Sequence, residues 1–333
     1  MRDHLNGLYV RAANHPTPGV GRAYTPEQVH TWLGVLARYL DTNATTGPVV
    51  GGRRLSGTDL VLHELWPLAG SHRARTAHAL LFTAASIAMG AAATIGSLLL
   101  DTSGTLLPPL WMVTTLSAAL STMVGLLGIR TETWPSPTRL APDKLRTPQG
   151  RLGAGLGLKV GLVFGFATTV WGGLAFELTT GLTLGLAVGL MAGLVLGAVA
   201  GGAEDGSFSV KDPRDLTRAD LTAGLGLALT GSLAGGLLMG ILGKLSDGNT
   251  LGLKVGLLAG LAFGPAFGLA LATAWLRYIA FLACTRRGPH QLPWRLGRFL
   301  NGATNAGILR ITGTAYQFRH RELQDWLAHN PTP

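Results

Sequence analysis

The chain has 333 residues, of which 47% are hydrophobic and only 13% charged, and its formal net charge is +10. An average soluble domain has about 25% charged residues, so this composition argues against an ordinary soluble protein. The single cysteine, Cys284, excludes an intramolecular disulfide and a zinc site built from several cysteines.

Residues 1–75 are polar and are expected to form a cytoplasmic helical segment. Within them the stretch from Tyr24 to Leu40 has the pattern of an amphipathic helix. Thr25 is the predicted N-cap, Pro26 suits the first helical position, and Gln28 completes a capping box.

Residues 76–276 are expected to form a transmembrane block. A helix that crosses about 30 Å of hydrocarbon needs roughly 20 apolar residues. The first such stretch, Thr76–Leu100, contains no Asp, Glu, Lys or Arg. Six transmembrane helices are predicted in all, at residues 76–100, 106–129, 152–175, 178–201, 221–243 and 250–274.

Glycine recurs at every fourth residue in three runs within this block. In a bilayer the backbone must bond to itself, so helices tolerate glycine, and small residues let neighbouring helices approach closely. A spacing of four exceeds the 3.6-residue turn, so each stripe winds around its helix, and the fourth and sixth spans are expected to contact two or more helices each. The predicted packing glycines are Gly153, Gly157, Gly161 and Gly165, then Gly181, Gly185, Gly189, Gly193, Gly197 and Gly201, then Gly248, Gly252, Gly256, Gly260, Gly264 and Gly268.

The charged residues alternate in a way that sets the orientation. Of the 27 Lys and Arg, eight precede the first predicted span, five lie in residues 130–151, three in 202–220, and eight follow the last span. The loops between these hold only Lys244. This is the positive-inside pattern, so both termini are predicted to be cytoplasmic in a bacterial plasma or inner membrane. The lipid bilayer is then the expected partner, and the basic charge needs no nucleic acid.

Two lysines, Lys159 and Lys254, lie inside predicted spans, where an ionisable group suggests a function. Each is within about two turns of a membrane edge, so each side chain can also snorkel to the headgroups. The heptapeptide at 156–162 recurs unchanged at 251–257, as in an inverted repeat of a transporter, whereas 152–158 resembles 221–227 in a parallel repeat. Three alternatives stay open for the stripes: packing of one bundle, self-association into a homo-oligomer, and a small-solute or ion channel or transporter.

Residues 277–333 are again polar and are expected to form a cytoplasmic, winged-helix-like segment. A helix is predicted near Leu292–Leu300, followed by two short strands that turn at Gly313 and by a closing helix, Arg321–His329. The fold class is therefore an all-α polytopic membrane protein with a small helix–hairpin–helix element. No phosphate-binding loop and no H-E-x-x-H motif occurs, so we expect no enzyme activity, no cofactor and no metal site.

The C-terminal segment resembles the signature F-x-H-x-x-x-Q-[DE]-x-[LF]-A, which closes the winged-helix part of NACHT-type STAND signal-transduction NTPases. The matching residues are Phe318, His320, Gln324, Asp325, Leu327 and Ala328. The stretch Trp32–Leu40 resembles a helix found after the NACHT core in bacterial, notably actinobacterial, members, some of which carry glycine-rich membrane helices in this region.

This resemblance implies the C-terminal, membrane-embedded region of such a protein without its NTPase core, because the chain has no Walker A or Walker B segment. The implied function is a non-enzymatic module that anchors and senses in signalling or defence, and an upstream NACHT NTPase module is an implied partner. In the family the signature histidine can contact the phosphate of the bound nucleotide. His320 matches that position, and such a role requires an NTPase core in cis or in trans.

Overall fold

The computed structural model describes residues 24–100, 137, 139–175, 178–204, 212–247, 268, 272–286 and 291–330. These residues are mostly helical. The α-helices are α2 (Pro26–Thr46), α3 (Ser71–Leu100), α5 (Pro148–Ala175), α6 (Leu178–Gly202), α7 (Pro213–Asp247), α9 (Thr273–Arg286), α10 (Leu296–Asn305) and α11 (Arg321–His329). Three short 3-10 helices are η1 (Leu62–Glu64), η2 (Trp66–Ala69) and η3 (Pro142–Arg146).

The described strands are short and form three antiparallel pairs, of which the first and the third are hairpins. They are β1 (Val49–Val50) with β2 (Arg53–Arg54), β3 (Arg139–Leu140) with β4 (Ala203–Glu204), and β5 (Leu309–Thr312) with β6 (Ala315–Phe318). The β5–β6 hairpin has Leu309 opposite Phe318 and Thr312 opposite Ala315. The predicted order of helix, hairpin and helix over the C-terminal segment is confirmed by α10, β5, β6 and α11.

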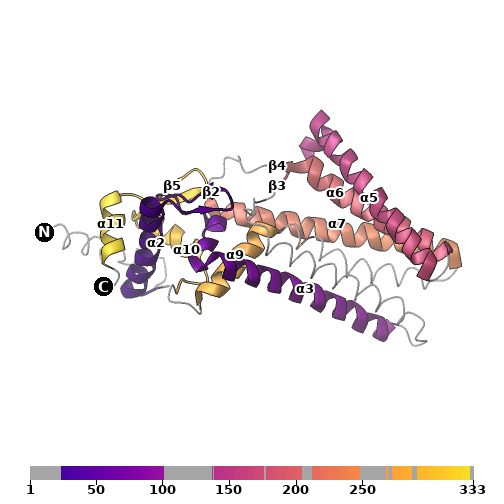
Figure 1. Ribbon diagram of the computed structural model, residues 1–333, viewed down its shortest axis with the longest axis horizontal. Helices are drawn as coiled ribbons and strands as arrows, with labels where there is room; N and C mark the ends of the chain where they lie inside the picture. Colours follow the sequence, from indigo (N-terminus) through magenta and orange to yellow (C-terminus); the bar gives the residue numbers. More distant parts are fainter. Residues whose placement is uncertain are drawn as a thin grey trace.

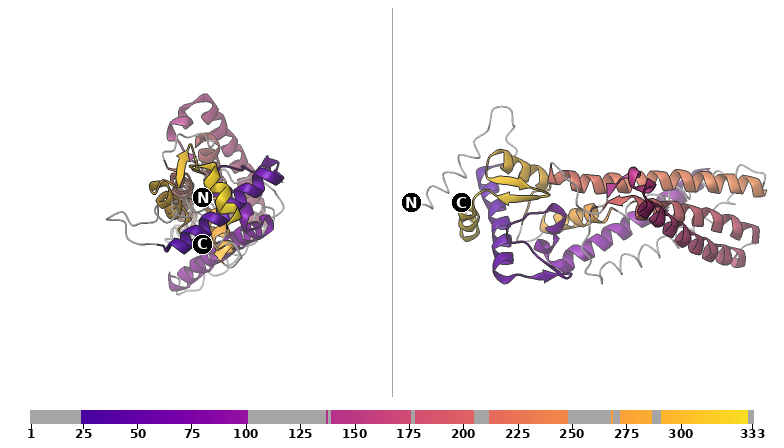
Figure 2. Two further views of the ribbon diagram at one scale, coloured as in Figure 1. Left: turned by 90° about the vertical axis from the view of Figure 1, so that its left-hand side faces the viewer. Right: turned by 90° about the horizontal axis from the view of Figure 1, so that it is seen from above.

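The molecule consists of a head from which long helices extend (Figure 1). α3 and α7 run away from the head, and α7 continues to the far end of the molecule when it is seen from above (Figure 2). α7 has 35 residues, which corresponds to about 52 Å at 1.5 Å per residue. It is therefore longer than the hydrocarbon core of a bilayer, about 30 Å.

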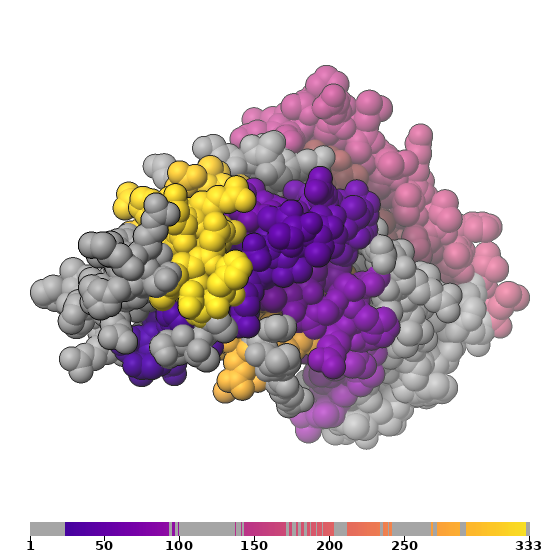
Figure 3. All heavy atoms as spheres, turned by 60° about the vertical axis from the view of Figure 1, so that its left-hand side comes forward, coloured from indigo at the N-terminus to yellow at the C-terminus, as the bar shows by residue number. Residues whose placement is uncertain are grey.

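Both ends of the chain build the single hydrophobic core of the head. Leu33 and Leu40 of α2 are fully buried in one cluster with Leu300 of α10, Tyr316 of β6 and Leu327 of α11. The space-filling view shows the C-terminal residues, in yellow, lying directly against the N-terminal ones, in indigo (Figure 3).

Backbone hydrogen bonds also join the two ends. Leu60 and Tyr316 exchange N–H to carbonyl bonds of 2.8 and 3.1 Å, so Leu60 extends the β5–β6 hairpin on its β6 side. Nearby, Nε2 of Gln324 donates to the carbonyl oxygen of Gly57 at 3.1 Å. The segment before α3 is thus held by the C-terminal hairpin and helix.

Several local predictions are confirmed. Thr25 caps α2 through a complete capping box with Gln28, and α2 ends at Gly47 in the left-handed conformation. α2 continues beyond the predicted end at Leu40, because nothing before Gly47 interrupts the helical backbone. The C-terminal hairpin turns at Gly313, where φ is 59°, and the closing helix has the predicted bounds Arg321–His329.

The structure supports part of the transmembrane prediction. The predicted spans 76–100, 152–175, 178–201 and 221–243 lie within or almost coincide with α3, α5, α6 and α7. Among the described residues, two stretches are long and apolar enough to cross a membrane by length and composition, Pro148–Val170 and Pro213–Leu238, and a shorter apolar stretch is Val188–Gly202. The predicted span 106–129 lies outside the described residues, as does 250–274 except for residue 268 and its last three residues.

Candidate functional site

The glycines of α5 lie against the backbone of α6. A methyl group at Gly157 would overlap the backbone of Gly197, and one at Gly161 would overlap that of Gly189 and Gly193. At Gly165 the added carbon would be 2.7 Å from the carbonyl oxygen of Gly185. Because the opposing atoms belong to the backbone, they cannot rotate away as a side chain can. We call this contact between α5 and α6 the glycine seam.

The α6 stripe faces one neighbour along its whole length. All six predicted glycines of this run, Gly181, Gly185, Gly189, Gly193, Gly197 and Gly201, have α5 or η3 atoms as their nearest contacts. One neighbour therefore covers the whole stripe, which the sequence analysis did not expect, whereas the expectation that this span contacts two or more helices is confirmed, because α6 also contacts α7. Two helices that wind around each other can follow a stripe whose period exceeds 3.6 residues, which explains how one partner covers it. At the start of the seam, Gly153 lies against Ala200.

The third predicted glycine run is described at only one residue, Gly268, which packs on α7. A carbon added at Gly224 would lie 2.6 Å from the carbonyl oxygen of Gly268 and 2.9 Å from Cβ of Ala272. A carbon added at Gly268 would lie 2.6 Å from Cβ of Ala228. Small residues thus allow a second close crossing. The remaining members of this run, Gly248, Gly252, Gly256, Gly260 and Gly264, lie outside the described residues.

Large apolar side chains cover the outward faces of α6 and α7. They recur every fourth residue and are between 43% and 65% exposed: Leu182, Leu186, Leu190 and Leu194 of α6, and Leu225, Leu229, Leu233 and Leu237 of α7. In the most apolar 18-residue stretch of α5 only 17% is buried, and in that of α7 only 31%. A core helix of a soluble protein would bury most of such an apolar stretch.

Only one of the two predicted intramembrane lysines, Lys159, lies in the described part of the chain. Lys159 is exposed on α5, whereas its neighbours Gly157 and Gly161 are buried against α6. Its charge therefore points away from the glycine seam. Lys254 lies outside the described residues.

The signature that includes His320 divides into buried and exposed members. Phe318, Gln324 and Leu327 are buried in the head, where they fix the turn from β6 into α11. His320 is exposed at the N-cap position of α11, and its side chain makes no capping hydrogen bond. The imidazole is therefore accessible to a second molecule.

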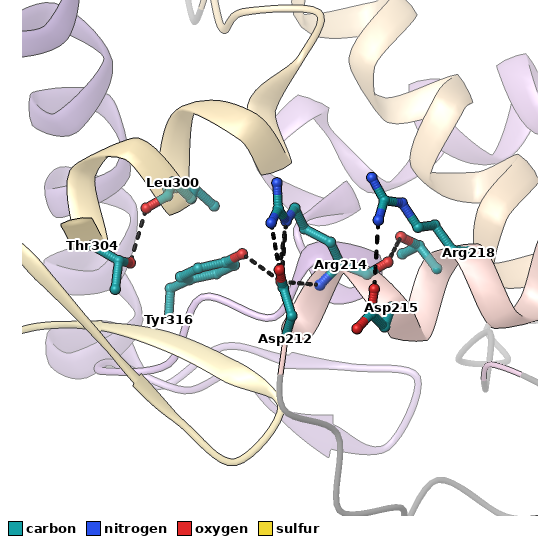
Figure 4. A network of polar contacts seen from close by, with 8 residues as sticks. Asp212, Arg214, Asp215, Arg218, Leu300, Thr304 and Tyr316 are labelled. Atoms are coloured by element: carbon teal, nitrogen blue, oxygen red, sulfur yellow. Dashed lines mark hydrogen bonds and ion pairs between the residues drawn. The ribbon is translucent and has the colours of Figure 1, made fainter. Parts of the chain in front are cut away.

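A polar cluster that the sequence analysis missed joins the head to the first turn of α7 (Figure 4). The Asp212 carboxylate accepts a hydrogen bond of 2.8 Å from Nε of Arg214 and one of 3.3 Å from the hydroxyl of the buried Tyr316. The hydrogen bond from Arg214 lowers the pKa of Asp212, while burial raises the pKa of Tyr316. Since Tyr316 belongs to β6, the hairpin and α7 are linked directly.

A second missed residue, Asp220, caps a helix other than its own. Its carboxylate is completely buried and accepts a hydrogen bond of 2.8 Å from the backbone N–H of Trp275, in the first turn of α9. A carboxylate at a helix N-terminus pairs with free backbone N–H groups and with the positive end of the helix dipole. The only available signal was an acidic residue next to a predicted span.

A third missed group lies where α9 meets α3. Arg277 is 5% exposed; its Nε donates to Nδ1 of His78 over 3.4 Å, and its guanidinium lies 5.1 Å above the centre of the Trp66 ring. Burial, together with the nearby Arg75, lowers the pKa of Arg277 to about 10. The cation therefore stays charged at neutral pH in a largely desolvated place.

These arrangements consist of close packing contacts and buried charged groups. Within the described residues, no group of three or more His, Cys, Asp or Glu could hold a metal ion. Searches against protein-family models, curated proteins and solved structures found no match to this chain.

Proposed function

We propose that the chain is a non-enzymatic, multi-pass membrane module that anchors, and transmits signals for, a NACHT-like signalling or defence protein. The observation that carries the membrane part is the contrast between the two ends of the molecule. The head encloses its leucines in one core, whereas α5, α6 and α7 expose theirs along their length. Lipid is the solvent that such faces require, since soluble monomers rarely expose large apolar patches.

The shared core of the head supports an even number of membrane crossings. Residues from both sides of the helical block, such as Leu33 and Leu300, lie in the same cluster, so both segments must be on one side of a bilayer. Six spans satisfy this requirement. The basic charge of both segments puts that side in the cytoplasm.

The link to NACHT proteins rests on the C-terminal signature and on its geometry. Its apolar and amide residues are used inside the head, and His320 is left exposed. A separate NTPase core could contact this imidazole. The contact of Tyr316 with Asp212 would then connect a movement of the hairpin to α7, which gives the module a physical route for sensing.

Cysteine labelling tests the membrane topology. In a Cys284→Ser background, a cysteine at Thr105 or Asn249 should react with a membrane-impermeant maleimide on intact cells. A control cysteine at Arg310, exposed in the head, should react only after lysis. Labelling of Thr105 or Asn249 from the cytoplasmic side alone would refute the topology.

Two further observations test the functional assignment. A reading frame upstream of Met1 that encodes a phosphate-binding loop would support a NACHT partner, and an unrelated gene there would count against it. The channel alternative predicts solute flux in liposomes that Lys159→Ala or Lys254→Ala abolishes. We expect no solute flux in these liposomes, because the glycines of the seam contact the backbone of a neighbouring helix.

A further inference from the structure

The strongest unexplained group in the molecule is the buried cation Arg277. Its Nη1 atom is buried and makes no hydrogen bond, and none of its described contacts is with a carboxylate. Arg75, on the adjoining helix α3, is close enough for its positive charge to act on Arg277. A buried charge without a counter-ion is costly, and two neighbouring cations increase that cost.

The existing neighbours of Arg277 orient the guanidinium without neutralising it. Because arginine is always the donor, His78 must accept through Nδ1 and is therefore neutral with its proton on Nε2. The Trp66 ring covers one face of the guanidinium and attracts it through its quadrupole, a weaker effect than an ion pair. One side of the planar fork, the Nη1 side, is thus left to bind an anion.

The position of this cluster indicates which anion it would meet. Arg75 lies just before the predicted first span, and Arg277 follows the predicted last span by three residues. Both are therefore at the cytoplasmic edge of the proposed membrane block, at the depth of the lipid phosphates. Guanidinium groups bind phosphate oxygens in a bidentate manner, and basic pockets between membrane helices on the cytoplasmic side bind anionic headgroups.

We propose that Arg277, together with Arg75, binds the phosphate group of an anionic phospholipid at the cytoplasmic end of the contact between α3 and α9. The inference rests on the proposed membrane insertion. Since Arg277 is 5% exposed and Nη1 is buried, binding requires α3 and α9 to part locally so that a phosphate oxygen reaches Nη1. Binding then supplies a counter-ion to Arg277, and it joins α3 to α9.

Native mass spectrometry of the full chain in mild detergent tests this proposal. Phosphatidylglycerol should bind about tenfold more tightly than phosphatidylcholine. Arg277→Gln should remove this preference, whereas the matched control Arg286→Gln, an exposed arginine on the same helix, should keep it. An equal loss in both variants, or no preference in the wild type, would overturn the proposal.

Additional arms separate the source of the phosphate and guard against misfolding. If millimolar inorganic phosphate, but no lipid, raises the unfolding temperature through Arg277, the ligand is soluble and the lipid assignment is wrong. If neither ligand depends on Arg277, the proposed phosphate site is refuted. Should Arg277→Gln not fold, Arg75→Gln must weaken phosphatidylglycerol binding several-fold, and unchanged binding would refute the site.

Alkaline carbonate extraction distinguishes this proposal from the membrane assignment itself. Wild type and Arg277→Gln should both stay in the membrane pellet. Release of the wild type would refute membrane insertion, whereas retention of both proteins without any lipid preference would refute the lipid site alone.

Discussion

Replacing one glycine of the seam by alanine should separate α5 from α6, and a nearby glycine provides the control. The methyl group of Gly161→Ala would overlap a carbonyl oxygen of Gly189 and the backbone of Gly193. Gly155, on the same helix, has nothing within 4 Å of an added carbon. Both substitutions have the same effect on helix propensity, at most about 1 kcal/mol in favour of alanine. The difference between the two variants therefore isolates the steric cost.

That difference should be about 1–3 kcal/mol, which is the usual cost of overpacking. The upper part of this range is expected because the obstructing atoms are backbone and the helices must move apart as a whole. The free energy of unfolding can be measured in dodecyl maltoside micelles by titration with SDS, followed by far-ultraviolet circular dichroism. Gly155→Ala should be neutral or slightly stabilising. If Gly161→Ala proves as stable as Gly155→Ala, the close backbone contact is wrong.

Three further predictions concern the head and its junction with the helices. Burial lowers the pKa of His63 from 6.5 to about 4. As the pH falls, the unfolded chain is therefore protonated at His63 before the folded chain is, and the free energy of unfolding should fall by up to about 3 kcal/mol between pH 6.5 and pH 4. Urea titrations of His63→Gln should lack this pH dependence of stability. Asp220→Ala should lower the free energy of unfolding in the SDS titration by about 1–2 kcal/mol because the N–H of Trp275 loses its acceptor, whereas Asp220→Asn should lose less; equal losses would contradict the capping role. Gly313→Ala should cost about 1–2 kcal/mol in urea unfolding, since φ is 59° there, and an unchanged midpoint would argue against the turn.

The sequence predicts the local features of this chain better than its long-range contacts. The capping box at Thr25, the turn at Gly313 and the helix Arg321–His329 follow from neighbouring residues, and the structure confirms them. Glycine spacing identifies the face of α6 that packs tightly. It does not identify the neighbour, because periodicity describes one helix and the partner depends on how two helices wind around each other.

Most of the contacts that the sequence analysis missed join residues far apart in the chain. Asp220 is 55 residues from the N–H that it caps, and Arg277 is 199 residues from His78. Such pairs leave no periodic pattern in a single sequence. A charged residue beside an apolar stretch reads as the end of a span, whether its side chain is solvated or buried against another helix.

The core of the head is built from residues near both ends of the sequence, so the head cannot finish folding until its last segment has been synthesised. The carbonyl oxygen of Gly57 accepts a hydrogen bond from the side chain of Gln324, which comes 267 residues later in the chain. During synthesis α2 therefore leaves the ribosome with its apolar face uncovered, and it stays so until every helix of the block has been made. In the proposed six-span topology, a chain that lacks one crossing would have the two halves of the core on opposite sides of the membrane. Such a chain could not bury Leu33 and Leu40 in the shared core, and the apolar face of α2 would stay exposed.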